Sequence, residues 1–255
     1  MATNKNMRRS EIPNLLLKNP NLRNEDFAKH FGVTLETIRS DMIYLEEKGI
    51  VKKLHGHAEV TDSFRTDKIH LNERVHLDEE GKKSVAKAAL DLIPNDSIIF
   101  LDSGSTVQKI AELLSLRSNI TVITNSLGVA NTIITQEQNH VYLAGGFVSS
   151  NGMLLNGPYL IDSIKQFKYN FAFLGTNGLK FYDGPTCLNY SHLPVKQLVI
   201  KNSEKVAVVC ASSKFSNGAV MQFATWDEID YLITDNIPDE QQNVLKNSNV
   251  QCIIA

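Results

Sequence analysis

Residues 31–49 read FGVTLETIRSDMIYLEEKG, and this stretch decides the fold of the N-terminal part of the chain. A glycine turn leads to Thr34, whose hydroxyl suits the N-cap of a helix. Ile38, Met42 and Leu45 then recur at the i, i+4, i+7 spacing of a single buried helix face. The stretch therefore predicts a capped amphipathic helix that follows a tight turn.

The flanking sequence places this helix in a larger module. A helix is expected to begin around Ser10, with Pro13 in its first turn, because a longer helix would be distorted at that proline. A second helix is expected to begin at a cap on Asn24. Gly49 suits the end of the third helix, and residues 50–60 read as a β-hairpin.

Helix, glycine-containing turn, helix and hairpin together outline a winged helix-turn-helix, which reads DNA with its second paired helix in the major groove. Arg39 is the strongest candidate base reader, because a guanidinium can bond guanine through two hydrogen bonds. The alternatives are a small helical bundle, or a metal pair at His55 and His57, for which a turn in the wing is favoured. The residues expected to contact DNA are Thr34, Leu35, Glu36, Thr37, Arg39 and Ser40 on the helix, and Lys52, Lys53 and His55 on the wing.

Composition is compatible with this interpretation but does not prove it. The 255 residues are 42% hydrophobic and 21% charged, with a formal net charge of −2, an ordinary balance for one or two globular domains. Residues 1–70 hold 12 Lys and Arg against 10 Asp and Glu, a weak positive excess. The start of the chain lacks the pattern of a signal peptide, and no apolar run is long enough to cross a bilayer. Three widely spaced cysteines favour a reducing cytoplasm and no zinc cluster.

The remainder of the chain alternates buried strands with helices. This alternation predicts an α/β fold with a mainly parallel sheet, covered by helices on both faces. The expected domains are a winged module at 1–57, a polar linker at 58–75 and an α/β domain at 76–255. The expected strands are 97–102, 120–124, 140–144, 171–175, 205–210, 231–234 and 250–254, and expected helices include 107–114, 127–134 and 194–201.

Small polar residues follow several of these strands, where ligands of parallel sheets bind. Backbone N–H groups at a helix start attract anions, so one such loop predicts a phosphate site, although a ligand-free helix cap would use the same residues. The candidate effector residues are Asp102, Ser103, Gly104, Ser105, Thr106, Asn125, Ser126, Gly145, Gly146, Thr176, Asn177, Gly178, Lys196 and Lys214.

The chain resembles the DeoR family of bacterial transcription regulators over nearly its whole length. The resemblance is carried by residues 31–49, by LHG at 54–56, by LDSGST at 101–106, by LAGG at 143–146, by LGTNG at 174–178 and by SKF at 213–215. It implies a cytoplasmic homo-oligomer that is usually a repressor of sugar-utilisation genes, released by a sugar phosphate. It also implies a sensor fold similar to ribose-5-phosphate isomerase and CoA-transferases.

The chain departs from the family pattern at several positions. Ser40 stands where the family often has arginine, and His57 where it often has a second glycine. The stretch around His192 and the position of Ala211 lack the usual glutamate and aspartate, which implies an altered effector site.

The sequence is compatible with three functions. The sequence favours a regulator that binds operator DNA and a phosphorylated sugar, with no cofactor, no metal and no membrane association. A sugar-phosphate isomerase is the alternative, and it would need a positioned base such as Asp102. The third is a DNA-bound regulator that senses no small molecule.

Overall fold

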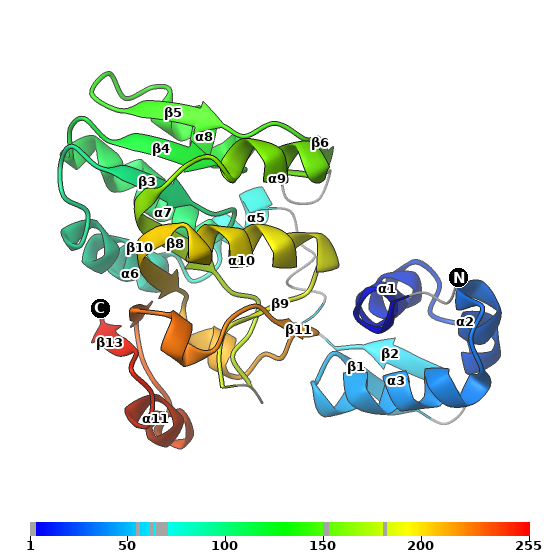
Figure 1. Cartoon of the computed structure of the whole chain (residues 1–255). Coiled ribbons are helices and arrows are strands. Elements are labelled where there is room, and N and C mark those ends of the chain that lie inside the picture. Colours follow the sequence, from blue (N-terminus) through cyan, green and yellow to red (C-terminus); the bar gives the residue numbers. More distant parts are fainter. Residues whose placement is uncertain (1–3, 55–56, 62–63, 65–70, 150–152, 181–182) are drawn as a thin grey trace.

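The computed structural model describes residues 4–54, 57–61, 64, 71–149, 153–180 and 183–255. They form an N-terminal winged helix-turn-helix module beside a larger α/β domain (Figure 1). The module contains α1 (Lys5–Lys18), α2 (Asn24–Phe31), α3 (Leu35–Glu47) and an antiparallel hairpin of β1 (Val51–Leu54) and β2 (His57–Val60).

Local sequence sets most boundaries of this module. Gly32 has φ of 64°, in the left-handed region, and ends α2, while Gly49 at φ 65° follows the end of α3. The Thr34 hydroxyl accepts a hydrogen bond from the Thr37 N–H at 3.2 Å, which confirms the expected cap. Ile38, Met42 and Leu45 are buried, as their spacing predicts.

Two expectations about the module's ends differ from the structure. Helix α1 begins at Lys5 and continues through Pro13, whereas the sequence predicted a start near Ser10. The helix is held on both sides of the proline by buried Ile12 and Leu16, so tertiary packing outweighs the backbone hydrogen bond that proline removes. Strand β2 runs to Val60, past the expected end of the module at residue 57.

The α/β domain is built on one seven-stranded sheet of order β13-β12-β10-β8-β3-β4-β5, in which every neighbouring pair is parallel. All seven expected strands are present, so the predicted fold class is confirmed. Their bounds are β3 (Ile98–Leu101), β4 (Thr121–Thr124), β5 (His140–Leu143), β8 (Tyr169–Gly175), β10 (Ser203–Val209), β12 (Tyr231–Thr234) and β13 (Gln251–Ile254).

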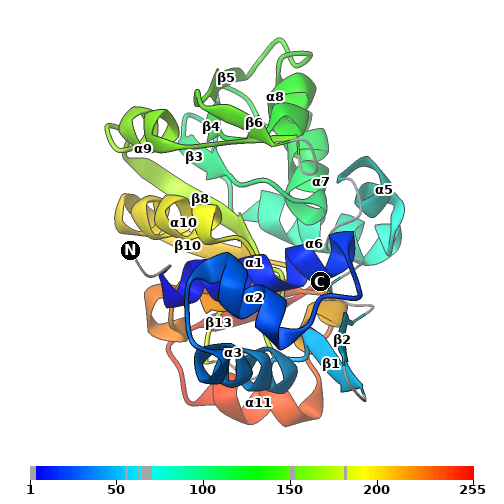
Figure 2. The same cartoon turned by 90° about the vertical axis from the view of Figure 1, so that its right-hand side faces the viewer.

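Helices cover both faces of this sheet (Figures 1 and 2). One face carries α6 (Glu79–Asp91), α7 (Ser105–Leu113) and α8 (Leu127–Ile133), and the other carries α9 (Pro158–Ile164) and α10 (Leu193–Lys201). α5 (Leu71–His76) precedes the sheet, and it begins inside the segment that the sequence predicted as linker. The remaining elements are β6 (Phe147–Ser149), β7 (Leu154–Asn156), β9 (Thr186–Cys187), β11 (Met221–Gln222), α11 (Asp239–Lys246) and the short 3-10 turns η1 (Leu114–Leu116), η2 (Tyr190–His192), η3 (Ser212–Phe215) and η4 (Trp226–Glu228).

The hydrophobic core continues from one domain into the other. One buried cluster contains Ile12 and Leu45 of the winged module together with Leu188 and Val220 of the α/β domain. The winged module therefore packs against the α/β domain and is not suspended from a free linker.

Candidate functional site

Helix α3 presents its polar residues to solvent. Thr34, Glu36, Arg39 and Ser40 are exposed, whereas Leu35 and Thr37 are half-buried. Arg39 lies 3.5 Å from the carboxylate of Glu36, and both side chains are more than half exposed. An exposed ion pair of this kind contributes little free energy, so Arg39 can leave Glu36 for a base edge at small cost.

The opposite side of α3 is anchored by a buried carboxylate that the sequence did not reveal. Asp41 accepts hydrogen bonds from Arg8 Nε at 2.5 Å and from Arg9 Nε at 2.6 Å, and all three residues are buried. The Arg9 guanidinium also lies over the ring of Tyr44, 3.7 Å from its centroid. These contacts fix the orientation of α3 on α1. The available signal in the sequence was the position of Asp41, a charged residue on the face of α3 that otherwise packs in the core.

The wing contributes exposed basic residues. Lys52 and Lys53 on β1 are both exposed. Lys53 Nζ lies 2.8 Å from Glu46, and this contact lowers the pKa of the Glu46 carboxyl. His57 lies on β2, 3.6 Å from Glu59, while His55 falls outside the described residues. Helix α3 and the wing thus form the surface that the sequence assigned to DNA.

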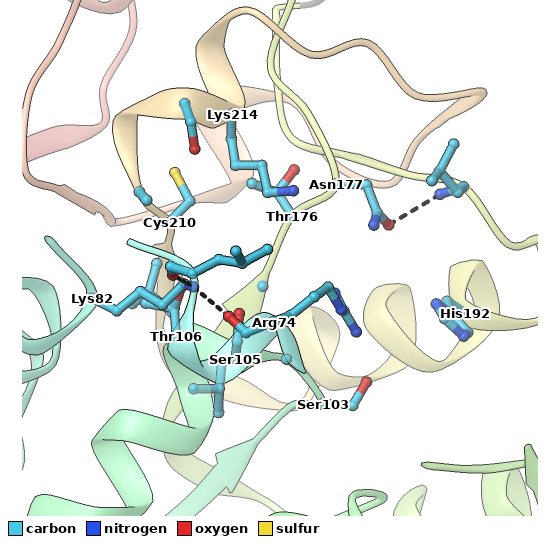
Figure 3. Close-up of a pocket in the computed structure, with 18 of the residues that line it drawn as sticks. Arg74, Lys82, Ser103, Ser105, Thr106, Thr176, Asn177, His192, Cys210 and Lys214 are labelled. Atoms are coloured by element: carbon cyan, nitrogen blue, oxygen red, sulfur yellow. Dashed lines mark hydrogen bonds between the residues drawn. The ribbon is translucent and has the colours of Figure 1, made fainter. Parts of the chain in front are cut away.

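A pocket of about 180 Å³ lies at the carboxyl ends of three neighbouring strands, β3, β8 and β10 (Figure 3). This is the expected place for a ligand in a parallel sheet. The residues that line it include most of one predicted group and several unexpected ones. They are Arg74, Leu77, Asp78, Lys82, Ser103, Gly104, Ser105, Thr106, Val107, Leu154, Gly175, Thr176, Asn177, Leu188, Asn189, His192, Lys196, Val209, Cys210, Ala211, Ser213 and Lys214.

Six predicted effector residues do not line this pocket: Asp102, which is described below, and five others. Asn125 is buried and its amide contacts the Leu155 carbonyl. Ser126 caps α8, where its hydroxyl accepts from the Val129 N–H. Gly145 lies in an exposed turn. Gly146 and Gly178 are close-packing glycines, because a Cβ would lie 2.4 Å from the Asn156 carbonyl oxygen in the first case and 2.2 Å from that of Asn217 in the second.

Asp102 lies beneath the pocket and is buried in an ion pair. Its Oδ2 accepts from Lys196 Nζ at 2.5 Å and from the Gly175 N–H at 3.0 Å. Lys196 donates in addition to the Gly175 carbonyl at 2.7 Å. The sequence named both Asp102 and Lys196 as candidate effector residues. In the structure their charges join the ends of β3 and β8 to α10, and of the two only Lys196 lines the pocket.

Three cations that surround the pocket come from different elements. Arg74 lies on α5, Lys82 on α6 and Lys214 on η3. Burial lowers the pKa of Lys82 to about 8; Asp78 opposes this shift, while Lys214 and Arg74 add to it. Lys82 Nζ donates to the backbone carbonyls of Arg74, at 2.6 Å, and of Leu77.

Neither Lys82 nor Arg74 was among the residues predicted from the sequence to bind the effector. Lys82 precedes buried Val85, Ala86 and Ala89 at i+3, i+4 and i+7, so a lysine on the apolar face of an amphipathic helix was the signal. Arg74 was assigned to the linker and gave no pattern of its own.

The loop between β3 and α7 supplies hydrogen-bond donors to the same pocket. Helix α7 begins at Ser105, and its N-cap residue is Gly104, with φ of 151° and no side chain to cap the first turn. The N–H groups of that turn and the hydroxyls of Ser105 and Thr106 therefore remain available to an anion. Figure 3 shows both hydroxyl residues on the pocket wall, close to Lys82.

Both positions at which the sensor half departs from the family pattern also border the pocket. His192 on η2 and Ala211 at the start of η3 line the pocket. Of the described lining residues, Asp78 alone has a carboxyl group. Cys210 also lines the pocket, but burial raises the pKa of its thiol to about 12, so it stays protonated.

The comparisons with known proteins agree with this architecture. A family model described as the DeoR-like helix-turn-helix domain matches residues 8–64, and one described as the DeoR C-terminal sensor domain matches residues 77–236. The chain is 31% identical to the glycerol-3-phosphate regulon repressor of Escherichia coli over 228 residues, which cover 89% of this chain and 90% of the relative.

Two further similarities were found. The lactose phosphotransferase system repressor of Staphylococcus epidermidis is 30% identical over 247 residues, which cover 96% of this chain and 97% of the relative. Among solved structures, ribose 5-phosphate isomerase A of Neisseria gonorrhoeae matches with a TM-score of 0.40 at 16% identity, over 58% of this chain and 56% of that one.

Fold and site together define a winged helix-turn-helix transcription regulator with an α/β sensor domain. The chain belongs to the DeoR family, as its ordered motifs predicted. Across the residues described, no helix combines the length and the apolar character needed to span a bilayer.

Proposed function

We propose that this regulator is a cytoplasmic repressor of carbohydrate-utilisation genes that binds operator DNA through α3 and the wing. In this proposal the pocket binds a phosphorylated sugar, and its occupancy changes the affinity for DNA. The two repressor relatives are named for glycerol 3-phosphate and for the lactose phosphotransferase system, which supports a ligand of this class. We propose no enzymatic activity.

The convergence of positive charge on an uncapped helix start is the observation that carries this proposal. Besides burial, which is the largest cause, the charges of Lys214 and Arg74 lower the pKa of Lys82, so these cations lie close enough to Lys82 to repel it. Such repulsion is unfavourable in the empty pocket and is relieved by an anion between these groups. A phosphate seated against Ser105 and Thr106 would provide that charge.

The rest of the pocket suits a small polyol chain. Thr176 and Asn177 follow β8 and supply polar groups. The Asn177 side chain already accepts from the Leu188 N–H at 3.2 Å, which leaves its amide N–H groups for a ligand. Because the stretch around His192 and the position of Ala211 lack the carboxylates usual in the family, the pocket also favours ligands with a second anionic group, such as a sugar bisphosphate or a phosphorylated sugar acid.

A binding role fits the pocket better than an isomerase role. Aldose–ketose isomerisation requires a base that can take a proton from the substrate. Asp102, the base that the sequence offered, is buried against Lys196 and does not line the pocket. Turnover of pentose or hexose phosphates that Asp102→Asn abolishes would restore the enzyme alternative.

A thermal-shift screen tests the effector proposal. The panel contains sugar monophosphates, sugar bisphosphates and phosphorylated sugar acids, with the matching unphosphorylated sugars as controls. At a ligand concentration 100 times its Kd, binding should stabilise the folded chain by ~2.7 kcal/mol. Ser105→Ala, Thr106→Ala and Lys82→Met should each reduce the shift, whereas Lys87→Met on the exposed side of α6 should not.

The outcomes of the screen separate the hypotheses. If no phosphorylated compound at millimolar concentration shifts melting or alters operator binding, the third hypothesis, a regulator that senses no small molecule, replaces ours. If a hit survives all three pocket substitutions unchanged, the ligand binds elsewhere.

Operator recognition is proposed to use paired modules. One winged module reads a short site, so two copies that read two half-sites are needed for useful selectivity in a genome. We therefore propose a homo-oligomer that associates through the α/β domain.

A further inference from the structure

The edge of the α/β domain formed by strand β5 is made from a long stretch of sequence without charged residues. Residues 138–161 contain no Lys, Arg, Asp or Glu, although 21% of the chain is charged. This run includes strand β5, the β6–β7 hairpin and the start of α9. Apolar side chains that flank β5 are nevertheless exposed to solvent. We call them the β5 edge surface: Ile134, Tyr142, Leu143, Phe147, Val148 and Tyr159.

The aromatic members of this surface are held in place by the fold. The Phe147 ring lies against Gly157, where a Cβ would come within 3.0 Å of it, and Phe147 remains 72% exposed. Tyr142 packs on Phe167, with ring centroids 4.9 Å apart. Tyr159, on the first turn of α9, is 74% exposed. Their outer faces are therefore presented on a supported surface.

β5 is also a terminal strand of the seven-stranded sheet, hydrogen-bonded to β4 on one side. Proteins usually protect an open sheet edge with charged residues, because an uncharged edge pairs readily with another chain. The strand β5 itself, His140–Leu143, carries no Lys, Arg, Asp or Glu, and large exposed apolar patches mark interaction sites.

We infer that the β5 edge surface binds a second copy of this chain about a two-fold axis. In a two-fold interface the same patch meets itself, so any charged residue near the centre would face its own kind. A surface without charges meets that requirement and offers nothing to a charged partner such as nucleic acid. Aromatic side chains bury roughly 150–250 Å² each. Weighted by exposure, Tyr142, Phe147 and Tyr159 alone offer on the order of 400 Å², about half of one partner's share in a standard interface.

The location of the surface agrees with this occupant. β5 and β6 lie at one end of the molecule, and α3 lies toward the other (Figure 2). Association through the β5 edge surface therefore leaves the recognition helix of each copy uncovered. This inference rests on the proposed pairing of DNA-binding modules and assigns that pairing to a surface.

Mass measurement of the full chain by multi-angle light scattering and sedimentation tests the inference. The wild-type chain at micromolar concentration should have at least twice the mass of one chain. Phe147→Asp and Tyr159→Asp place like charges across the two-fold axis and should each reduce the mass toward that of a single chain. Ile254→Asp is the matched control: Ile254 is 63% exposed on the other edge strand, β13, and its substitution should leave the mass unchanged.

Melting temperatures and DNA binding make every outcome decisive. The substituted side chains are largely exposed, so each variant should melt within a few degrees of wild type. A monomeric variant should still bind an isolated half-site but lose cooperative binding to a full operator. A wild-type chain that is monomeric on and off DNA, or patch variants that keep the full mass, would overturn the inference. If the wild-type chain does not bind a half-site at all, the proposed function is refuted instead.

Discussion

The hydroxyl of Tyr44 donates a hydrogen bond to the backbone carbonyl of Val220 over 2.8 Å. Tyr44 belongs to the recognition helix, and Val220 lies just after η3, which carries the pocket residues Ser213 and Lys214. Two residues before Val220, Gly218 packs directly against the backbone carbonyl of Lys48, the residue that follows α3. The turn η2, which also borders the pocket, contacts α1. Thus η2 and the segment that follows η3 both touch the DNA-binding module.

Replacement of Tyr44 by Phe tests whether this contact transmits the ligand signal. A ligand changes DNA affinity only through contacts that differ between the two states. Loss of one hydrogen bond removes ~1 kcal/mol, so the ratio of operator affinities with and without the bound sugar phosphate should shrink by up to about fivefold. Tyr231→Phe, at a half-buried tyrosine of β12, is the control. An unchanged ratio in Tyr44→Phe would show that the hydrogen bond carries no signal. Fluorescence anisotropy on labelled operator measures both ratios.

Gly218→Ala should uncouple the domains more strongly. A Cβ at this position would lie 1.9 Å from the carbonyl oxygen of Lys48, so the module must move away from the α/β domain. Overpacking of this kind typically costs ~1–3 kcal/mol. We expect the variant to retain the melting shift with sugar phosphate while its operator affinity no longer responds. Gly145→Ala is a matched control, since a Cβ there meets nothing within 4 Å. A normal operator response in Gly218→Ala would contradict this role for the domain contact.

The sequence was sufficient where local rules act alone. The cap at Thr34, the stop at Gly32 and the seven strands of the sheet follow from side-chain chemistry and periodicity. It was insufficient where distant residues decide the outcome. α1 passes through Pro13 because the core holds both of its halves, and no local pattern reports that.

The pocket shows the same division. The loop at 103–106 was found because it follows a strand and opens a helix. Asn125 and Gly146 follow strands as well, yet their side chains or backbone are used in packing, which only the tertiary structure reveals. Lys82 reaches the pocket from a helix that precedes the sheet, so no strand-end rule could identify it.

Asp41→Asn should destabilise the DNA-binding module without touching DNA. The substitution leaves the buried guanidinium groups of Arg8 and Arg9 without their carboxylate. Removing one partner of a buried ion pair costs ~3–5 kcal/mol. The substitution should therefore lower the urea concentration at which the module unfolds and abolish operator binding. Glu47→Gln, at an exposed position on the same helix, should change stability by less than ~0.5 kcal/mol. Equal urea midpoints for wild type and Asp41→Asn would show that the buried ion pairs do not stabilise the module.

Arg39→Ala should separate base reading from phosphate contact. Loss of a bidentate arginine–guanine contact costs ~1–3 kcal/mol at the cognate site and relaxes the preference at that base. Lys52→Ala should weaken binding to all sequences alike and flatten the salt dependence. Binding titrations against a panel of single-base operator variants at two salt concentrations distinguish these results. Full selectivity in Arg39→Ala would place the recognition surface elsewhere on the module.

Effector binding should weaken as pH rises through about 8. Burial lowers the pKa of Lys82 to about 8, so its ammonium is charged at pH 7 and largely neutral at pH 9. A hydrogen bond to a charged group contributes ~1.5–3 kcal/mol, so the Kd for a sugar phosphate should rise by up to about tenfold across this range, the limit set by the loss of one proton. The phosphate is a dianion throughout, since its second pKa lies near 6, and cannot itself cause the change.

The stability of the ligand-free chain should respond to pH in the opposite direction. Lys82 has a lower pKa in the folded chain than in the unfolded one, so the unfolded state binds more protons between about pH 8 and 10.5. Stability conferred by this group therefore rises with pH in that window.

Calorimetric titration from pH 7 to 9.5 measures the pH dependence of the Kd for the sugar phosphate directly. Lys82→Met should bind weakly at every pH and lose the pH dependence, while Lys87→Met should reproduce the wild-type profile. A Kd that is constant across this range in the wild type would exclude Lys82 from the phosphate site.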